Sequence, residues 1–236
     1  MKTTGTRMRA SGLRLLCSKI GTYIKLRRHM SSEDWYRNTE WNVAIEAAFE
    51  AKLRRARRKE QYLRIQACVL ASVRPDIALA LLDRYFQLPD KFDNAQAHVD
   101  RANAYLAQGK LPEAMLSLED ALNREAEYPH SLTQAYLDLP YLIAVNGVAE
   151  QYARAKELLV AQRKRLMFPV DTFKWNVASA LIAKARNEYD SSRLFARAAL
   201  EAAGADRSDF RYHPSVGLVG ESYGEVRGQM RKLCAA

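Results

Sequence analysis

The sequence predicts an all-α protein built from successive helix hairpins. Apolar residues make up 48% of the 236 residues, and in the central part of the chain they recur with a period near 3.6, the spacing of one helix face. Only 10 Gly and 7 Pro are present, and they fall mostly between the periodic segments. Helices separated by short turns therefore account for the pattern.

The clearest hairpin covers residues 95–129. Small side chains let two helices approach closely, an aromatic side chain fills the space beside them, and a glycine permits a tight turn. In chain order these positions are Ala102, Tyr105, Gly109, Ala114 and Ala121, followed by Pro129. Their order and approximate spacing resemble a tetratricopeptide repeat. The resemblance implies a right-handed superhelix, or solenoid, of helix hairpins whose concave face binds a segment of another protein.

Weaker copies of this hairpin are expected over residues 59–89, 131–165 and 171–204. Their second helices should start near Pro75, Pro112, Ala149 and Tyr189, at offsets of 37, 37 and 40 residues. These offsets are slightly longer than the family's usual period of about 34. Turns are expected at Gly109, at Asn146-Gly147 and near Asn187. Asp171 should cap the last hairpin, Gly204 should end it, and Pro140 should kink the helix that contains it.

Three parts of the chain are expected. Residues 1–32 form a basic, disordered leader, residues 33–204 a helical array, and residues 205–236 an irregular tail with a short capping helix over 225–234. The array should open with one capped helix, Ser32–Arg58, that covers the first hairpin. The segments Asp34–Asn42 and Tyr62–Ala67 are also similar to a set of bacterial proteins, and this resemblance implies no function.

The net charge of +10 is concentrated in the leader. Residues 1–32 contain eight Lys and Arg and no acid, which leaves 29 basic and 27 acidic residues in the remaining 204. Such a leader suits a transit peptide, an anionic lipid surface or a phosphate backbone. It equally suits a disordered extension before an alternative start at Met30.

Motifs for catalysis and metal binding are absent from the sequence. The cysteines (Cys17, Cys68, Cys234) and histidines (His29, His98, His130, His213) lack the spacing of metal sites or of a disulfide framework. No GxSxG, P-loop or GxGxxG motif occurs. We therefore expect a cytoplasmic, non-catalytic protein without metal or cofactor.

Two surfaces are candidates for binding. The family resemblance implies a mixed apolar and basic groove along the first helices, which would bind an acidic and apolar segment of a partner protein. Its candidate residues are Arg64, Cys68, Val99, Asn103, Leu106, Tyr141, Lys174, Val177, Leu181 and Lys184. The alternative is a nucleic-acid or anionic-surface binder that uses the leader and a basic patch. The patch consists of Lys52, Arg54, Arg55, Arg57, Arg58 and Lys59, which could equally be the solvated end of a helix.

A third segment leaves two interpretations open. Trp35, Tyr36, Arg37 and Asn38 combine aromatic faces with polar donors, a composition common at recognition surfaces. The same residues could instead form a hydrophobic staple that fixes the entry of the first helix.

Overall fold

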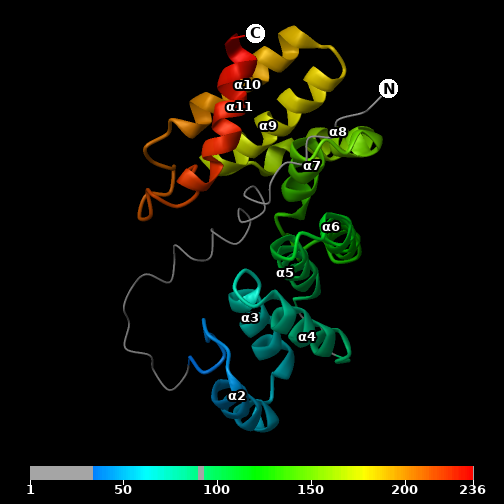
Figure 1. Ribbon diagram of the computed structural model, residues 1–236, viewed down its shortest axis with the longest axis vertical. Coiled ribbons are helices and arrows are strands. Elements are labelled where there is room, and N and C mark those ends of the chain that lie inside the picture. The colour runs from blue at the N-terminus through cyan, green and yellow to red at the C-terminus, as the bar shows by residue number, and fades with distance from the viewer. Residues whose placement is uncertain (1–33, 90–92, 236) are drawn as a thin grey trace, which may run out of the picture. The chain divides into compact units, whose positions relative to one another are not determined.

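The computed structural model describes residues 34–89 and 93–235, and within these ranges the protein is all-α, with ten α-helices and no strand (Figure 1). The helices are α2 (Val43–Arg55), α3 (Lys59–Leu70), α4 (Pro75–Phe86), α5 (Asn94–Ala107), α6 (Leu111–Glu127), α7 (Ala135–Val145), α8 (Tyr152–Ala161), α9 (Pro169–Ala185), α10 (Tyr189–Ala203) and α11 (Gly224–Ala235). Three short 3₁₀ helices are η2 (Ala149–Gln151), η3 (Arg163–Arg165) and η4 (Glu221–Tyr223). The expected leader, residues 1–32, lies outside the described ranges. None of the described helices has the length and apolar character needed to cross a lipid bilayer.

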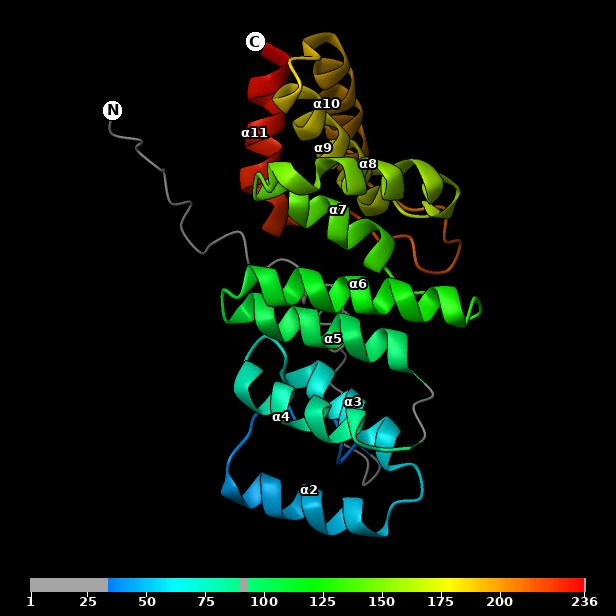
Figure 2. The same cartoon turned by 90° about the vertical axis from the view of Figure 1, so that its right-hand side faces the viewer.

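The chain divides into two compact units, unit 1 (residues 1–114) and unit 2 (residues 115–236), and the division falls within α6. In unit 1, α3, α4 and α5 pack against one another and α2 packs against α3 (Figure 2). Their shared core joins Phe49 and Leu53 of α2 to Leu63 and Leu70 of α3 and to Leu82 of α4. The helices of unit 1 therefore share one apolar core.

The first described helix begins later than the sequence predicts. We expected a helix from Ser32 to Arg58, but α2 begins at Val43 because the Asn42 side chain accepts a hydrogen bond from the Ile45 amide, 3.0 Å away, and caps the helix there. The preceding segment is held by packing instead. Trp35 lies against the rings of Phe49 and Tyr62, with centroids 5.4 and 4.8 Å away. Its aromatic ring thus has a structural role.

Unit 2 is built around α9. This helix packs against α7, α8 and α10, and α11 packs mainly against α10 and also touches α9 (Figure 1). Apolar residues of α11 and of the preceding η4 recur every three or four positions and are buried: Tyr223, Val226, Met230 and Leu233. A helix thus lies where the sequence predicted one over 225–234, and its apolar face is covered.

Three hairpin turns share one backbone conformation. Gly109, Gly147 and Asn187 have positive φ values of 75°, 68° and 62°. In each turn the amide after this residue bonds to the carbonyl five residues earlier: Lys110 to Tyr105, Val148 to Ile143 and Glu188 to Ala183. These are Schellman helix ends, in which a left-handed residue lets the chain satisfy the last carbonyls and reverse. The turns predicted at these positions are confirmed.

The predicted helix starts are also close to those observed. α4 starts at Pro75, η2 at Ala149 and α10 at Tyr189, while α6 starts at Leu111, one residue before the position expected. α9 starts two residues before Asp171, which caps from inside the helix: its carboxylate accepts a hydrogen bond from the Phe168 amide, 3.2 Å away. α7 runs continuously through Pro140.

The segment between α10 and α11 packs against the start of α9 and is hydrogen-bonded to it. The Val170 amide donates to the Gly217 carbonyl, 2.8 Å away, and the rings of Phe168 and Phe210 stack with centroids 5.2 Å apart. Gly217 has a φ of 75°, and a Cβ there would lie 2.4 Å from the Phe168 ring. Only glycine fits this contact without movement.

Candidate functional site: a basic cleft in unit 1

Two charged residues of the predicted groove, Arg64 and Lys174, are each paired with an acid of the same unit. In unit 1, Arg64 of α3 reaches Asp100 of α5, 36 residues later, with a distance of 3.0 Å. In unit 2, Asp138 of α7 binds Lys174 of α9, again 36 residues later, at 2.5 Å. Asp100, Asp138 and Lys174 are 0%, 5% and 2% exposed. These pairs cross-link successive first helices.

The pairing fixes the charges of both cations. Burial lowers the pKa of Lys174, but the Asp138 carboxylate outweighs it and the net pKa is raised. Burial opposes the charge of Arg64 in the same way, and Asp100 and Asp93 together raise its pKa. Both side chains are therefore positively charged, and their charge is neutralised inside the protein.

This arrangement corrects part of the predicted groove. Lys174 is buried against Asp138, so it does not face a partner. Tyr141 and Leu181 are buried as well, and Tyr141 meets the Tyr223 ring edge to face, with centroids 6.3 Å apart. In unit 2 the expected groove residues other than Lys184 are therefore core residues. Val99, Leu106 and Val177 are also buried. Asn103 and Cys68 are half-buried, and Lys184 is exposed.

Second helices are linked at a similar spacing. Arg84 of α4 makes a bidentate ion pair with Glu50 of α2, 34 residues earlier, and Arg154 of α8 makes one with Glu119 of α6, 35 residues earlier. These groups are partly exposed, so each pair contributes modestly to stability. Their separations of 34 and 35 residues are close to the 36 residues that separate the partners of the buried pairs.

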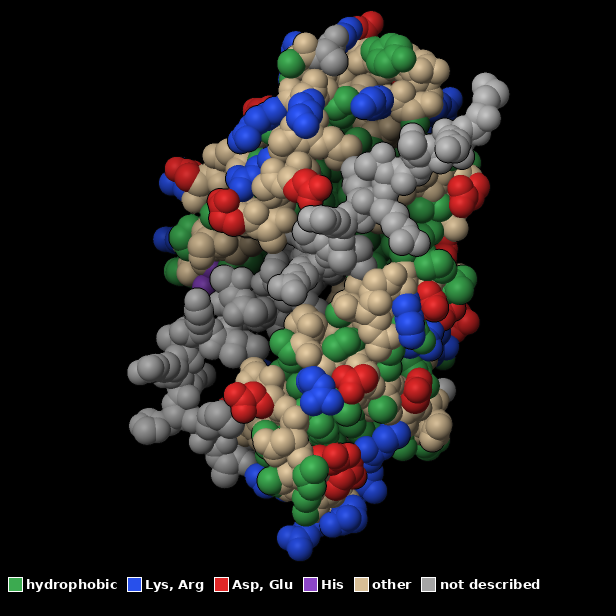
Figure 3. All heavy atoms as spheres, viewed as in Figure 1, with side chains coloured by type: hydrophobic (Ala, Val, Ile, Leu, Met, Phe, Trp, Pro, Cys, Tyr) green, Lys and Arg blue, Asp and Glu red, His purple; other side chains and the backbone are tan. Residues whose placement is uncertain are grey.

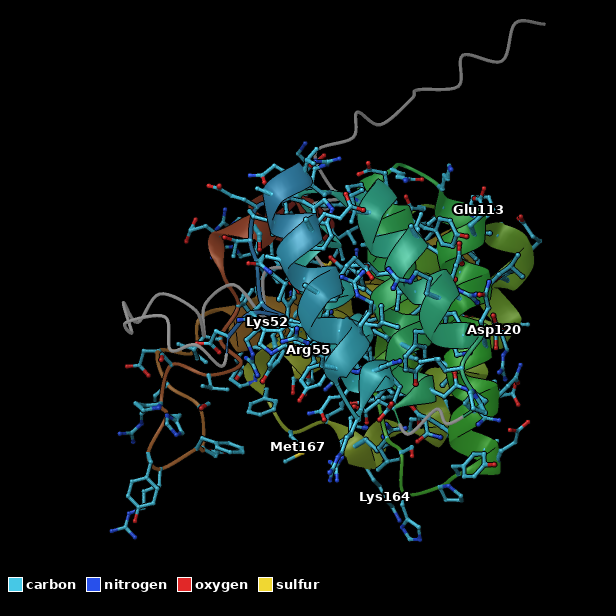
Figure 4. The ribbon with its side chains drawn as sticks, turned by 90° about the horizontal axis from the view of Figure 1, so that it is seen from below. Lys52, Arg55, Glu113, Asp120, Lys164 and Met167 are labelled. Atoms are coloured by element: carbon cyan, nitrogen blue, oxygen red, sulfur yellow. The ribbon has the colours of Figure 1, made fainter. Side chains whose placement is uncertain are left out.

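The basic patch spans the end of α2, the following loop and the start of α3. Figure 3 shows Lys and Arg side chains gathered at the end of unit 1 where α2 lies. Lys52 and Arg55 project from the same side of α2 in Figure 4, and the Lys52 ammonium lies 6.0 Å from the Trp35 ring centroid. The other five cations of the patch make no ion pair with any residue that the structure describes: Arg54, Arg55, Arg57, Arg58 and Lys59.

A cleft of about 680 Å³ opens beside the second half of this patch. Its basic wall is formed by Arg57, Arg58, Lys59 and Arg64. Leu88 and Pro89, which follow α4, supply an apolar wall, and Tyr85 closes the floor with 1% of its surface exposed. Two acids, Glu60 and Asp93, also line the cleft, and Asp93 is paired with Arg64 at 3.0 Å. We call this feature the basic cleft. It contains Arg64 of the predicted groove together with three of the six residues of the predicted basic patch.

The start of α3 has unusual electrostatics for a helix N-terminus. Arg58 occupies the N-cap position, Lys59 is the first helical residue, and no described side chain caps the helix. Helix N-termini favour acids, because unpaired amides and the helix dipole place positive charge there. Arg58 and Lys59 are unfavourable at this position, and Glu60 in the first turn offsets only part of their charge. The basic cleft is therefore suited to carboxylate or phosphate groups.

The segment Trp35–Asn38 serves the core of unit 1 more than a surface. The Asn38 amide nitrogen and side-chain amide both donate to the Gln66 side-chain oxygen, each at 2.9 Å, and Gln66 donates back to the Asn38 carbonyl at 2.8 Å. Gln66 is fully buried. These bonds satisfy a buried polar group and tie the segment to α3.

Sequence reasoning missed the acidic partners of the groove cations. Asp100 lies on α5, 36 residues after Arg64, and Asp138 lies on α7, 36 residues before Lys174, and this shared separation was the available signal. Among the described residues, no group of three or more His, Cys, Asp and Glu side chains is arranged to hold a metal ion. Comparison with protein-family models, curated proteins and solved structures gave no match.

Proposed function

We propose that the protein is a non-catalytic adaptor that binds an acidic segment of a partner protein in the basic cleft. The observation that carries this proposal is the set of three exposed cations, Arg57, Arg58 and Lys59, which lack ion pairs with described residues and line a cleft of about 680 Å³. Folding gains little from three neighbouring uncompensated charges. A ligand that supplies carboxylates would compensate them.

The recurring contacts support a tetratricopeptide-like repeat architecture for this adaptor. Ion pairs recur at separations of 34 to 36 residues. The Schellman turns at Gly109, Gly147 and Asn187 recur at a comparable spacing. In such arrays each hairpin buries its apolar face against the next, which leaves an extended surface for a peptide. A superhelix is part of the proposal.

A peptide suits the basic cleft better than a nucleic acid does. Single-stranded nucleic acids bind through cations together with exposed aromatic rings on which bases stack. Among the described lining residues the one aromatic ring, that of Tyr85, is buried, while Leu88 and Pro89 offer aliphatic surface beside the cations. An acidic segment with apolar residues matches both walls. Nucleic acid or an anionic surface remains the second candidate, because Arg54 and Arg55 extend the positive charge beyond the cleft.

A selection from a random peptide library displayed on phage tests the proposal. The full chain should enrich peptides rich in Asp and Glu that also carry apolar residues. The triple variant Arg57→Glu/Arg58→Glu/Lys59→Glu should lose the enrichment of those of these peptides that bind in the basic cleft, because it reverses the charge of one wall. The matched control, Arg207→Glu/Arg231→Glu/Lys232→Glu, changes the net charge equally at exposed positions of unit 2 and should retain it.

Two outcomes would contradict the proposal. One is enrichment that is equal for the full chain and both variants, since the basic cleft would then be irrelevant. The other is the absence of acidic peptides together with salt-sensitive binding of a single-stranded RNA oligonucleotide that the triple variant abolishes. The second result would show that the basic cleft binds nucleic acid, as the second candidate function proposes.

A further inference from the structure

A second pocket lies in unit 2, between α8, α9 and α10. Its volume is about 240 Å³, and Leu159, Val160, Trp175, Ile182 and Phe195 form its apolar lining. Small-molecule and cofactor sites usually enclose about 300–1,000 Å³. This pocket is below that range, and its size suits a single large side chain.

The aromatic wall of this pocket is held in place before any ligand arrives. The Trp175 indole N–H donates to the Leu159 carbonyl at 2.8 Å, and the Phe195 ring meets the indole edge to face with centroids 5.7 Å apart. The indole is half-buried, so one part of it remains available at the pocket. Val160, which is 67% exposed, continues the apolar surface. A rigid aromatic wall reduces the entropy lost on binding.

One cation, Lys156, lines the rim of the pocket, and a second, Arg163, lies beside Trp175. Lys156 is exposed and makes no ion pair with the described part of the chain. Arg163 likewise has no ion pair there, and its guanidinium lies 5.1 Å from the Trp175 ring centroid. The acid in the lining, Glu188, is paired with Arg186 at 2.9 Å. An occupant that carries acidic residues around an apolar anchor complements this rim.

We propose that this pocket is a docking site for an acidic peptide segment of a partner protein, which inserts one large apolar side chain against Trp175. The apolar anchor supplies affinity, as buried aromatic and aliphatic side chains do at the centres of interfaces, and flanking carboxylates face Lys156 and Arg163. The site does not depend on the basic cleft of unit 1.

The test uses a capped synthetic peptide of about 12 residues with one central Phe flanked by Glu, a length that suits a single anchored segment. Its binding to the full chain is followed by fluorescence anisotropy. Replacing the Phe with Ala should weaken binding by about 30-fold, because a hot-spot anchor contributes about 2 kcal/mol. Lys156→Glu in the protein should weaken binding about tenfold.

Two further variants separate this site from other basic surfaces. Lys232→Glu changes the same charge on α11, outside the pocket lining, and should leave the affinity unchanged. The triple variant of the basic cleft should retain peptide binding that Lys156→Glu still weakens. The indole N–H resonance of Trp175, assigned by its loss in Trp175→Phe, should shift on peptide addition.

Several results would overturn this inference. One is an affinity that stays the same when Ala replaces the Phe anchor, and another is equally tight binding of a peptide with Lys in place of Glu. A third is binding that is lost only in the triple variant. A fourth is no binding at a peptide concentration of about 1 mM, which corresponds to a negligible affinity. Displacement of the peptide by a single-stranded RNA oligonucleotide, with both affinities reduced in Lys156→Glu, would also overturn it, because the pocket would then serve another class of ligand.

Discussion

The buried pair of Asp138 and Lys174 stabilises unit 2 only while both partners are present. In Lys174→Met the Asp138 carboxylate would stay buried without its cation, and we expect the free energy of unfolding to fall by about 3–5 kcal/mol. Adding Asp138→Leu should restore most of this loss, because two apolar side chains need no mutual compensation. Urea unfolding of the single and double variants measures both effects. A double variant as unstable as the sum of the single variants would contradict the pairing.

Tyr136 makes stability depend on pH in the alkaline range. Burial and then the nearby Asp171 carboxylate raise the pKa of its phenol from 10.0 to about 12. The folded state therefore keeps the phenol neutral where the unfolded chain ionises. Its contribution to stability is complete below pH 10 and is lost as pH rises toward 12, with a slope of at most about 1.4 kcal/mol per pH unit. Urea unfolding at several alkaline pH values should show a shallower loss in Tyr136→Phe than in the native sequence, and equal slopes would contradict this.

Alanine substitutions at Gly217 and Gly109 distinguish the cost of steric crowding from the cost of backbone strain. Both have a φ of 75°, but a Cβ at Gly109 meets nothing within 4 Å, whereas at Gly217 it overlaps the Phe168 ring. Gly109→Ala should therefore lower the free energy of unfolding by about 1–2 kcal/mol, the left-handed backbone penalty. Gly217→Ala should lower it further, because Phe168 must also move. Thermal unfolding of the two variants checks this order. Equal losses of unfolding free energy would show that the Phe168 side chain moves aside without a cost.

The helices were the most predictable elements, because their boundaries depend on local residues. Pro75, Gly109 and Gly147 each determine a helix start or turn through their own backbone preferences. The start of α2 was predicted wrongly because Ser32 and Asn42 are both acceptable caps in sequence. Packing decides between them: Trp35 and Asn38 bind α3 and thereby keep the segment before Asn42 out of the helix.

Substitutions at Asn187 test whether the hairpin turn needs a residue that tolerates the left-handed backbone conformation. It occupies the left-handed position that glycine fills at 109 and 147, with a φ of 62°. Asn187→Gly should leave the free energy of unfolding unchanged or raise it slightly, because glycine adopts this backbone without strain. Asn187→Val should lower it by about 1–2 kcal/mol. Thermal unfolding distinguishes the two variants, and a stable Val variant would show that the turn can adopt another conformation.

At the scale of the whole molecule, the all-α class followed from composition and periodicity, but the candidate site did not. A single sequence shows that Lys174 is basic and lies on a first helix. It does not show that Asp138 meets it, nor that residues 205–235 return to pack against α9 and α10. Long-range packing therefore buries Lys174, Tyr141 and Leu181, which the sequence placed in a binding groove. The basic patch is exposed because its residues lie near a helix end and a loop, where none of the described helices covers them.

Hydrogen–deuterium exchange of the full chain tests the central claim most directly. The protein is measured alone and with an acidic peptide that the full chain enriches in the library selection and the triple variant of the basic cleft does not. We expect slower exchange at the first amides of α3, Lys59 to Gln61, because a bound carboxylate would accept hydrogen bonds from this N-terminus. The triple variant of the basic cleft should show no such protection. Protection confined to other helices, with unchanged exchange at the start of α3, would contradict binding in the basic cleft.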